Sequence, residues 1–576
     1  MTIEAAPKRS AWSAIKVYGE RRALVMLALG FASGLPNLLI FDTLSAWLRD
    51  AGLSLEVIAF FSLATLAYSL KLLWAPMIDR AAIPGLTQWL GHRRSWMLVC
   101  QALIMLGLWL ISGVDPKTSL GLMAAFAVFV GFTSATQDIV IDAWRIEAAD
   151  TEKQGAMAAA YQWGYRIAMI VAGVVPLAMS DVVGWSLSYA LMAGLMVVGV
   201  AGVLGAPREA KHILRDIDFQ GVAGVPWRDG IEWVIRLAIV LLGALIFGSG
   251  LAGNATVLQS VTTAIGQPQL GDAIKAAWEA KPFGVFAQVG GILTGVALIV
   301  VAALPIPGAP TRPGRYLSTA LGAPFIDFFR RYGDVAGLIL ALICVYRLSD
   351  FVLNIMNPFY IDLGFDKLQI AEVRKVLGVV MSVIGVGLGG FCVARLGLMR
   401  SMVIGAFAGP ISNLVFAWLA FQGPNLWALS VAIGVDNIAS GFAGTCLIAY
   451  MSSLTGAGFT ATQYAMFSSF YALLGKLVAS QSGKVVEGSA KAADQGGMFA
   501  GLKGLFTGLP PETFASAMEK SGVTPAALGS GYVVFFVYSA LLGVLGIILV
   551  FIVAARTADM PAGGTEADPE PEPEPA

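Results

Sequence analysis

The chain consists of long apolar stretches separated by short polar segments. A membrane-spanning helix needs about 20 mainly apolar residues to cross the hydrocarbon layer. Fourteen stretches of suitable length can be marked, and each predicts a transmembrane helix. They cover residues 23–47, 54–78, 95–114, 119–144, 155–180, 185–206, 233–253, 284–304, 335–360, 370–394, 398–420, 426–454, 463–486 and 531–555. The pattern predicts an all-α polytopic membrane protein with 14 transmembrane helices.

Composition excludes most other classes of protein. The 576 residues are 57% hydrophobic and only 13% charged, whereas a soluble protein carries about 25% charged residues. A net charge of zero gives no basic surface for nucleic acid. Two histidines and four separated cysteines cannot supply a zinc set, and no Walker motif is present. We therefore expect no metal, no cofactor and no enzyme, but a secondary transporter driven by a proton or ion gradient.

The distribution of basic residues predicts the topology. With the N-terminus placed in the cytoplasm, 22 of the 37 Lys and Arg residues fall in cytoplasmic segments and nine in outer segments. Basic residues favour the cytoplasmic side. The first apolar stretch lacks a signal-peptide cleavage site. We expect a multi-pass membrane protein with both termini in the cytoplasm.

The two ends of the chain resemble each other. Residues 47–55 align with residues 359–367 at an offset of 312, and Asp138 aligns with Asp436 at an offset of 298. Two six-helix halves of parallel topology are typical of the major-facilitator fold, in which substrate binds between the halves. The expected organisation is an N-terminal half at 1–206, a linker with two inserted helices at 207–334, a C-terminal half at 335–556 and a disordered Pro/Glu tail at 557–576.

Ionisable side chains inside the apolar stretches are the main functional candidates, because a charge at bilayer depth is costly unless it is paired or faces water. The candidates for proton coupling are Asp138, Asp142, Asp42, Asp350 and Asp436. Asp142 is either a proton carrier or, with Arg145, part of a gate at the cytoplasmic end. The deeper Asp138 favours a functional role.

Cations, amides and aromatic rings near these acids are candidates for binding an anionic substrate. They are Arg166, Arg347, Lys476, Lys71, Gln137, Tyr68, Gln162, Trp163, Tyr165, Asn354 and Gln463. An arginine offers a planar fork that suits a carboxylate. Lys476 has no partner nearby in the sequence and could pair with Asp436.

The segment between the second and third stretches predicts a gate. Asp79, Arg80, Arg93 and Arg94 form a D-R…R-R pattern that resembles the loop signature of major facilitators. In that family the acid packs near the start of the eleventh helix, which would be a conformational role. Arg145 and Glu147 are assigned to the same gate.

Several segments together resemble the AmpG-type muropeptide permeases. They are GFASGLP at 30–36, FFSL at 60–63, KLLWAPMIDR at 71–80, SATQDIVIDAW at 134–144, GYR at 164–166, YRLSD at 346–350 and TQYA at 462–465. The resemblance implies proton-driven import of GlcNAc-1,6-anhydroMurNAc and its peptides, for cell-wall recycling and the β-lactamase induction signal. It implies a protein that works as a monomer in the bacterial inner membrane, with protons and a small-molecule muropeptide as its partners.

Two other functions stay open. One is a major facilitator for another organic anion such as acetyl-CoA, or a drug exporter; residues 173–176 (GVVP) lack the contiguous Gly-Pro expected of antiporters. The other is a membrane sensor that no longer transports.

Overall fold

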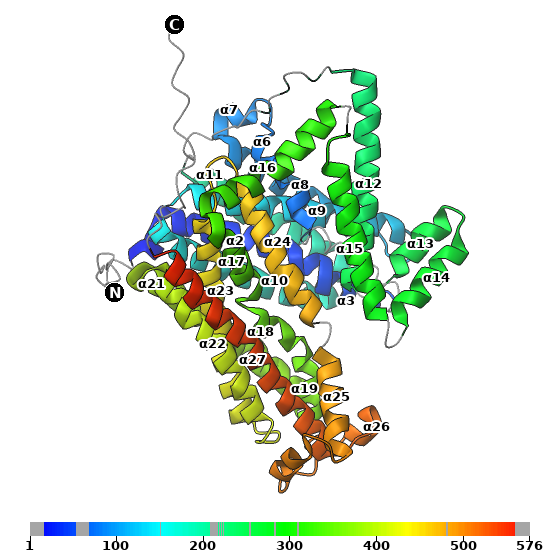
Figure 1. The fold of residues 1–576 in the computed structure, drawn as a ribbon, viewed down its shortest axis with the longest axis vertical. Helices are drawn as coiled ribbons and strands as arrows, with labels where there is room; N and C mark the ends of the chain where they lie inside the picture. The colour runs from blue at the N-terminus through cyan, green and yellow to red at the C-terminus, as the bar shows by residue number, and fades with distance from the viewer. Residues whose placement is uncertain are drawn as a thin grey trace.

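The computed structural model describes residues 16–52, 68, 70–149, 151–207, 217, 219, 222, 224–252, 255–280, 284–307, 310–479 and 482–558. Regular structure in this part of the chain is helical throughout (Figure 1). Eleven helical segments are long and apolar enough to cross a membrane, and one of them, Lys153–Gly205, covers two predicted stretches. The all-α membrane class is confirmed. The count of fourteen stays a prediction, because most of 54–78 lies outside the described residues.

The N-terminal half follows the predicted stretches closely. Its helices are α2 (Arg21–Leu38), η2 (Leu39–Thr43), α3 (Leu44–Asp50), η4 (Lys71–Leu73), α6 (Ala75–Arg80), α7 (Leu86–Leu90), α8 (His92–Ser112), α9 (Leu120–Glu147), α10 (Thr151–Leu195) and α11 (Val197–Gly205). Gly184 interrupts α10 with a φ of 81°, a value that glycine adopts without strain. This turn separates the predicted stretches 155–180 and 185–206.

The C-terminal half departs from the prediction at its first helix, because 335–360 is not one continuous helix. Arg347 has a non-helical φ of −116° and ψ of 23°. It separates α17 from α18, so this stretch holds four short pieces: α17 (Ala336–Val345), α18 (Leu348–Phe351), η6 (Val352–Ile355) and α19 (Met356–Leu363). An apolar run shows where a helix can lie but not where its backbone bends.

The remaining helices complete this half. They are α20 (Lys367–Glu372), η7 (Val373–Gly378), α21 (Val379–Leu396), α22 (Leu398–Leu419), α23 (Leu426–Ser453), α24 (Thr460–Ala479), α25 (Ser482–Asp494), η8 (Ala500–Phe506), α26 (Ala517–Ser521) and α27 (Pro525–Arg556). The run around Phe499–Phe506, which has amphipathic character in the sequence, forms η8.

The two halves share an irregular turn at the same repeat position. In the first half η2 is a π-helix over Leu39–Thr43. The offset of 312 places this turn at 351–355, where η6 is a 3₁₀-helix over Val352–Ile355. π-Bulges occur often at functional sites. The matched irregularity supports the internal repeat independently of the aligned residues.

The inserted segment forms a helical hairpin beside the N-terminal half and a further helix that the apolar pattern does not predict. Helices α12 (Pro226–Ala252) and α15 (Gly284–Ala303) pack along each other and are joined by α13 (Thr256–Ala264) and α14 (Pro268–Glu279) (Figure 1). Helix α16 (Arg312–Tyr332) follows them and is amphipathic, with Phe328 buried and Ile326 exposed.

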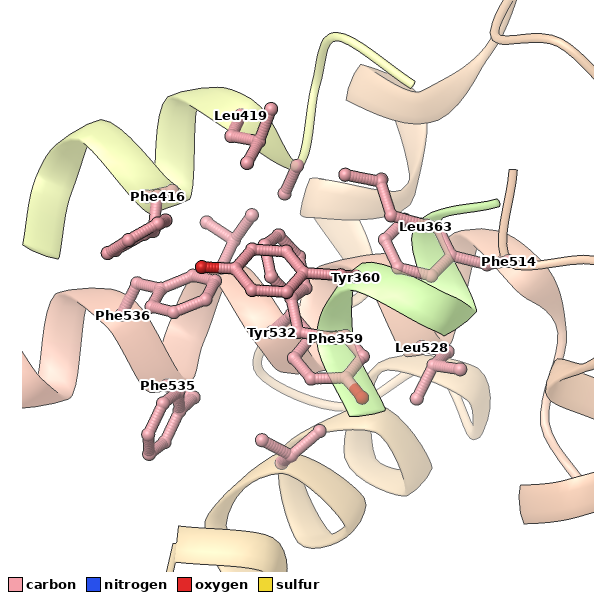
Figure 2. Packing of buried hydrophobic residues seen from close by; sticks show 14 of the residues in the cluster. Phe359, Tyr360, Leu363, Phe416, Leu419, Phe514, Leu528, Tyr532, Phe535 and Phe536 are labelled. Atoms are coloured by element: carbon pink, nitrogen blue, oxygen red, sulfur yellow. The ribbon is translucent and has the colours of Figure 1, made fainter. Parts of the chain in front are cut away.

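An aromatic cluster closes the far end of the C-terminal half (Figure 2). The ring of Phe359 lies 4.8 Å from that of Phe536 and 4.9 Å from that of Tyr532, measured between centroids. Phe514, from the segment between α25 and α27, stacks on Tyr532 at 5.9 Å. This segment is therefore anchored in the core of its half.

Helices α2 and α10 approach each other so closely that their backbones touch. A Cβ built on Gly164 would lie 1.9 Å from the carbonyl oxygen of Leu27, and one on Gly30 would lie 2.1 Å from that of Tyr161. Small residues allow such contacts between membrane helices. This contact fixes the position of α10, which carries most of the candidate site.

Gly164→Leu is expected to separate α2 from α10 and to prevent recovery of monodisperse, folded protein. Gly194→Leu, on the same helix but with nothing within 4 Å of the added Cβ, should leave the protein intact. The measurement is thermal unfolding and size-exclusion chromatography in detergent. Equal melting temperatures for the two variants would contradict the close contact.

Candidate functional site

One end of the molecule is closed by a buried carboxylate that joins the two halves. Asp79, which is 3% exposed, accepts hydrogen bonds from the backbone N–H of Thr462 (2.8 Å), its hydroxyl (2.6 Å) and the backbone N–H of Ala461 (3.3 Å). These donors lie in the first turn of α24, where the helix dipole also favours a negative charge. Arg93 donates to Asp79 and to Glu147, each at 2.7 Å.

The residues predicted for the gate thus divide into two groups. Asp79, Arg93 and Glu147 form one buried network at the closed end. Arg94 instead donates to the carbonyl oxygen of Val203, which ties α8 to α11 inside the N-terminal half. Arg80 is half-buried at the end of α6.

Helix α10 makes further connections to the C-terminal half. Gln162 donates to the Thr445 hydroxyl at 2.7 Å, and the Trp163 indole N–H donates to the carbonyl oxygen of Val383 at 2.9 Å. The Tyr18 hydroxyl donates to the carbonyl oxygen of Gly387 at 3.0 Å. In Figure 1, α26 and the start of α27 stand clear of the N-terminal half, so the halves diverge away from these contacts.

Asp142 lies between two cations near the closed end. Its carboxylate is 3.2 Å from Arg145 and 3.8 Å from Lys71. The Arg145 guanidinium also lies over the ring of Tyr464 on α24, 5.1 Å from the centroid. The contact of Arg145 with Tyr464 crosses between the halves, and Asp142 is tied to it through Arg145.

A cavity of about 280 Å³ lies on the inner side of α10. It is lined by Tyr161, Gln162, Tyr165, Arg166 and Met169. Within the described residues, Arg166 has neither a hydrogen bond nor an ion pair from its side chain. A half-buried arginine without a protein partner is available to an anionic ligand.

A second cation faces this region from the C-terminal half. Gly444 on α23 brings the two halves together: a Cβ there would lie 3.0 Å from Nη1 of Arg347 and 3.6 Å from Oε1 of Gln162. Arg347 is close enough to Arg166 for their charges to interact. Arg347 therefore lies near Gln162, one of the residues that line the cavity.

Arg347 is held by its own half of the molecule. It donates to Asp350 at 2.8 Å, to the Ser440 hydroxyl at 2.5 Å and to the Tyr471 hydroxyl at 3.3 Å. The break between α17 and α18 places it there. Asp350 neutralises Arg347, so these two predicted candidates act as a pair.

Among the described residues, the repeat-related acids Asp138 and Asp436 accept hydrogen bonds from hydroxyls and form no ion pair with a cation. Asp138 is buried and accepts a hydrogen bond from Ser33 on α2. Asp436 accepts one from Ser412 on α22 at 3.4 Å. Asp142 and Asp350 are each bonded to an arginine, whereas Asp138 and Asp436 are each bonded to a serine hydroxyl.

The other predicted candidates are distributed around this centre. Tyr68 donates to Ser134 (2.9 Å), Gln137 donates to the carbonyl oxygen of Ala32 (3.0 Å), and Tyr165 accepts from Asn37 (2.5 Å). Asp42 is exposed on η2. The side chains of Asn354 and Lys476, including a pairing of Lys476 with Asp436, lie outside the described part of the chain.

Gln463 lies away from the cavity. It is fully buried at the start of α24, where it accepts from Arg331 (3.0 Å) and donates to Asp327 (2.8 Å), both on α16. Its amide therefore joins the inserted segment to the C-terminal half.

The candidate set from sequence omits several polar residues that complete the site. Ser33 and Asn37 are four residues apart on α2, and they bond to Tyr161 and Tyr165, four residues apart on α10. Residues four apart share a helix face. The matching spacing could have predicted these two pairs from the sequence, but only if α2 and α10 were already known to be neighbours. Within the described residues, no group of His, Cys, Asp and Glu could hold a metal ion.

Asp79→Asn is expected to open the closed end, because removing one charge from a buried, hydrogen-bonded network costs about 3–5 kcal/mol. Spin labels at the exposed positions Trp89 and Arg400, in protein lacking the four native cysteines, should report a longer distance in this variant. Asp115→Asn, at an exposed turn, is the control. Identical distance distributions in both variants would contradict the gate.

Comparison with known proteins agrees with this geometry. Residues 26–480 match the Major Facilitator Superfamily. The chain is 29% identical to the anhydromuropeptide permease of Escherichia coli K12 over 476 residues, 82% of this chain and 76% of that protein. It is 28% identical over 474 residues to a Rickettsia conorii protein named as AmpG transporter 4, covering 82% of this chain and 91% of the relative. The solved proton:xylose symporter XylE superposes with a TM-score of 0.50 at 10% identity, over 94% of this chain and 96% of that one, which shows the fold. The chain belongs to the Major Facilitator Superfamily and is a membrane transporter, similar to the AmpG-type permeases.

Proposed function

We propose that the protein imports GlcNAc-1,6-anhydroMurNAc and its peptides across the bacterial inner membrane, together with protons. The observation that carries this proposal is Arg166, a cation without a protein partner in the described residues that lines a cavity facing Arg347 of the other half. The name of the Escherichia coli relative supports the class of substrate.

The chemistry of the cavity suits a ligand that carries both carboxylate and sugar hydroxyls. Arg166 supplies a planar donor for a carboxylate. The amide of Gln162 and the rings of Tyr161 and Tyr165 supply hydrogen-bonding groups and flat surfaces for a sugar. A purely apolar drug would leave the Arg166 charge without a counter-ion, which disfavours the drug-exporter alternative.

The closed end gives the direction of loading. Under the topology inferred from the basic residues, the Asp79 network lies at the cytoplasmic side, and the divergent ends of the halves face the periplasm. The structure then represents a state that loads from outside. Breaking the Asp79, Tyr18 and Gln162 contacts would release the substrate inward by rocking of the halves.

Proton coupling is assigned to the central acids that have no cation bonded to them within the described part of the chain. An acid in an ion pair holds its charge, whereas an acid bonded only to hydroxyls can gain a proton without breaking a salt bridge. Asp138 meets this condition in the N-terminal half and Asp436 in the C-terminal half.

Arg166→Ala is expected to weaken binding of GlcNAc-1,6-anhydroMurNAc more than tenfold. A hydrogen bond to a charged group contributes about 1.5–3 kcal/mol. Binding is measured by calorimetry on the detergent-solubilised protein, and uptake in proteoliposomes with an imposed proton gradient. Arg400→Ala, an exposed arginine at the start of α22, is the control.

A neutral methyl ester of the sugar acid tests whether charge is recognised. The native protein should bind the ester more weakly than the acid, and Arg166→Ala should bind the two alike. Failure of the folded native protein to bind or accumulate the acid would overturn the proposed substrate. Competition by acetyl-CoA, and not by muropeptides, would favour the other organic anions.

A further inference from the structure

A short chain of hydroxyl groups leads from the cavity to the buried Asp138. Tyr161 lines the cavity, and its hydroxyl lies 2.7 Å from that of Ser33. The Ser33 hydroxyl in turn donates to Oδ1 of Asp138. Three helices, α10, α2 and α9, thus contribute one group each to an unbroken path.

When Asp138 is ionised, the number of available protons sets the direction of each hydrogen bond in this chain. A serine hydroxyl has a single proton to donate. Because Ser33 gives it to the Asp138 carboxylate, it must accept from Tyr161. The Tyr161 proton therefore points to Ser33, and the lone pairs of the Tyr161 oxygen are left for the cavity.

Asp138 is the one acid within the hydrogen-bonded chain of Tyr161, Ser33 and Asp138. Other charged groups of the described residues surround this chain. Two charged residues act electrostatically on Asp138: Lys71 on η4 and Asp142 on α9. Asp138 in turn acts on three neighbouring groups, which are Tyr68, Tyr165 and Cys100 of α8. Lys71 lies 3.8 Å from Asp142. Asp142 is also bound by Arg145 at 3.2 Å. Arg166 lies beside Tyr161 on the cavity side of the chain.

We propose that the Tyr161–Ser33–Asp138 chain reverses when Asp138 gains a proton, so that the Tyr161 hydroxyl changes from an acceptor into a donor toward the cavity. This inference rests on the proposed function, because it names how proton and anionic substrate are coupled at the same site. Ser33 and Tyr161 are positioning residues that connect the acid to the ligand.

The proton step is balanced, because one O–H bond forms for each O–H bond that breaks. A hydronium ion in the cavity gives a proton to the Tyr161 oxygen and becomes water. The original Tyr161 proton passes to Ser33, and the original Ser33 proton passes to Asp138. Each hydroxyl forms one O–H bond and breaks one, while the carboxylate becomes a neutral acid.

The reversal changes what the cavity offers to an anion. With Asp138 ionised, the Tyr161 oxygen presents lone pairs beside Arg166 and repels a carboxylate oxygen. With Asp138 protonated, Asp138 donates to Ser33, Ser33 donates to Tyr161, and Tyr161 donates to the ligand. Protonation therefore favours binding, and by linkage binding favours protonation.

The test is the dependence of substrate affinity on pH. The full-length protein in detergent is titrated with GlcNAc-1,6-anhydroMurNAc at successive pH values. In the native protein the dissociation constant should decrease as the pH is lowered, by up to about tenfold per pH unit, which is the limit for one linked proton. Ser33→Ala and Tyr161→Phe should each reduce this slope to less than about twofold per unit. Tyr189→Phe is the matched control, because the Tyr189 hydroxyl on α10 donates to the carbonyl oxygen of Leu39 and does not join the chain.

The outcomes separate the relay from the proposed function. Loss of the slope in Ser33→Ala and Tyr161→Phe, together with a native slope in Tyr189→Phe, supports the relay. A full slope in both folded variants overturns the relay and leaves muropeptide transport intact. Absence of binding by the native protein at every pH overturns the proposed substrate and, with it, the relay that rests on it. Thermal unfolding verifies that each variant is folded.

Discussion

The cost of burying charge governs the arrangement of this transporter. An isolated ion in a low-dielectric interior is unfavourable by many kcal/mol, so it must find a partner or face water. Asp79 is held by Arg93 and the start of α24, Asp142 by Arg145 and Lys71, and Asp350 by Arg347. Asp138 and Asp436 are bonded to serine hydroxyls, whereas Arg166 has no partner among the described residues and lies at a cavity. The pairing of the other charges makes its position informative.

These ion pairs and hydrogen bonds fall into two groups, those that join the two halves and those that lie within one half. Contacts of Asp79, Arg145 and Gln162 cross between the halves and hold one end shut. The contacts of Arg347 stay within one half and keep its cation at the cavity through the break in its helix. Charges that join the halves must separate in each transport cycle, whereas charges within a half can move with it as a unit.

Sequence reasoning found the membrane class, the repeat and the central charges, because an acid or arginine inside an apolar run is rare and costly wherever it points. It could not place Gln463, because an amide at a helix start looks the same whether it faces a cavity or a neighbouring helix. Its partners are on α16, a helix with only one apolar face that falls below the threshold of a spanning stretch. The helix break at Arg347 could not be predicted, because the residues on both sides of it are apolar enough to form one continuous spanning helix. Ser33 was not selected because a serine carries no charge, and its role depends on which helix packs against α2.

The glycine contact between α2 and α10 has a consequence for motion. Since no side chain separates Gly30 and Gly164 from the opposing backbone, neither helix can slide or rotate without collision. Helices α2 and α10 therefore move as one rigid unit, and distances between their residues stay constant while the two halves rock. The Tyr161–Ser33 step of the proposed relay therefore joins two helices that the moving parts of the cycle do not pull apart.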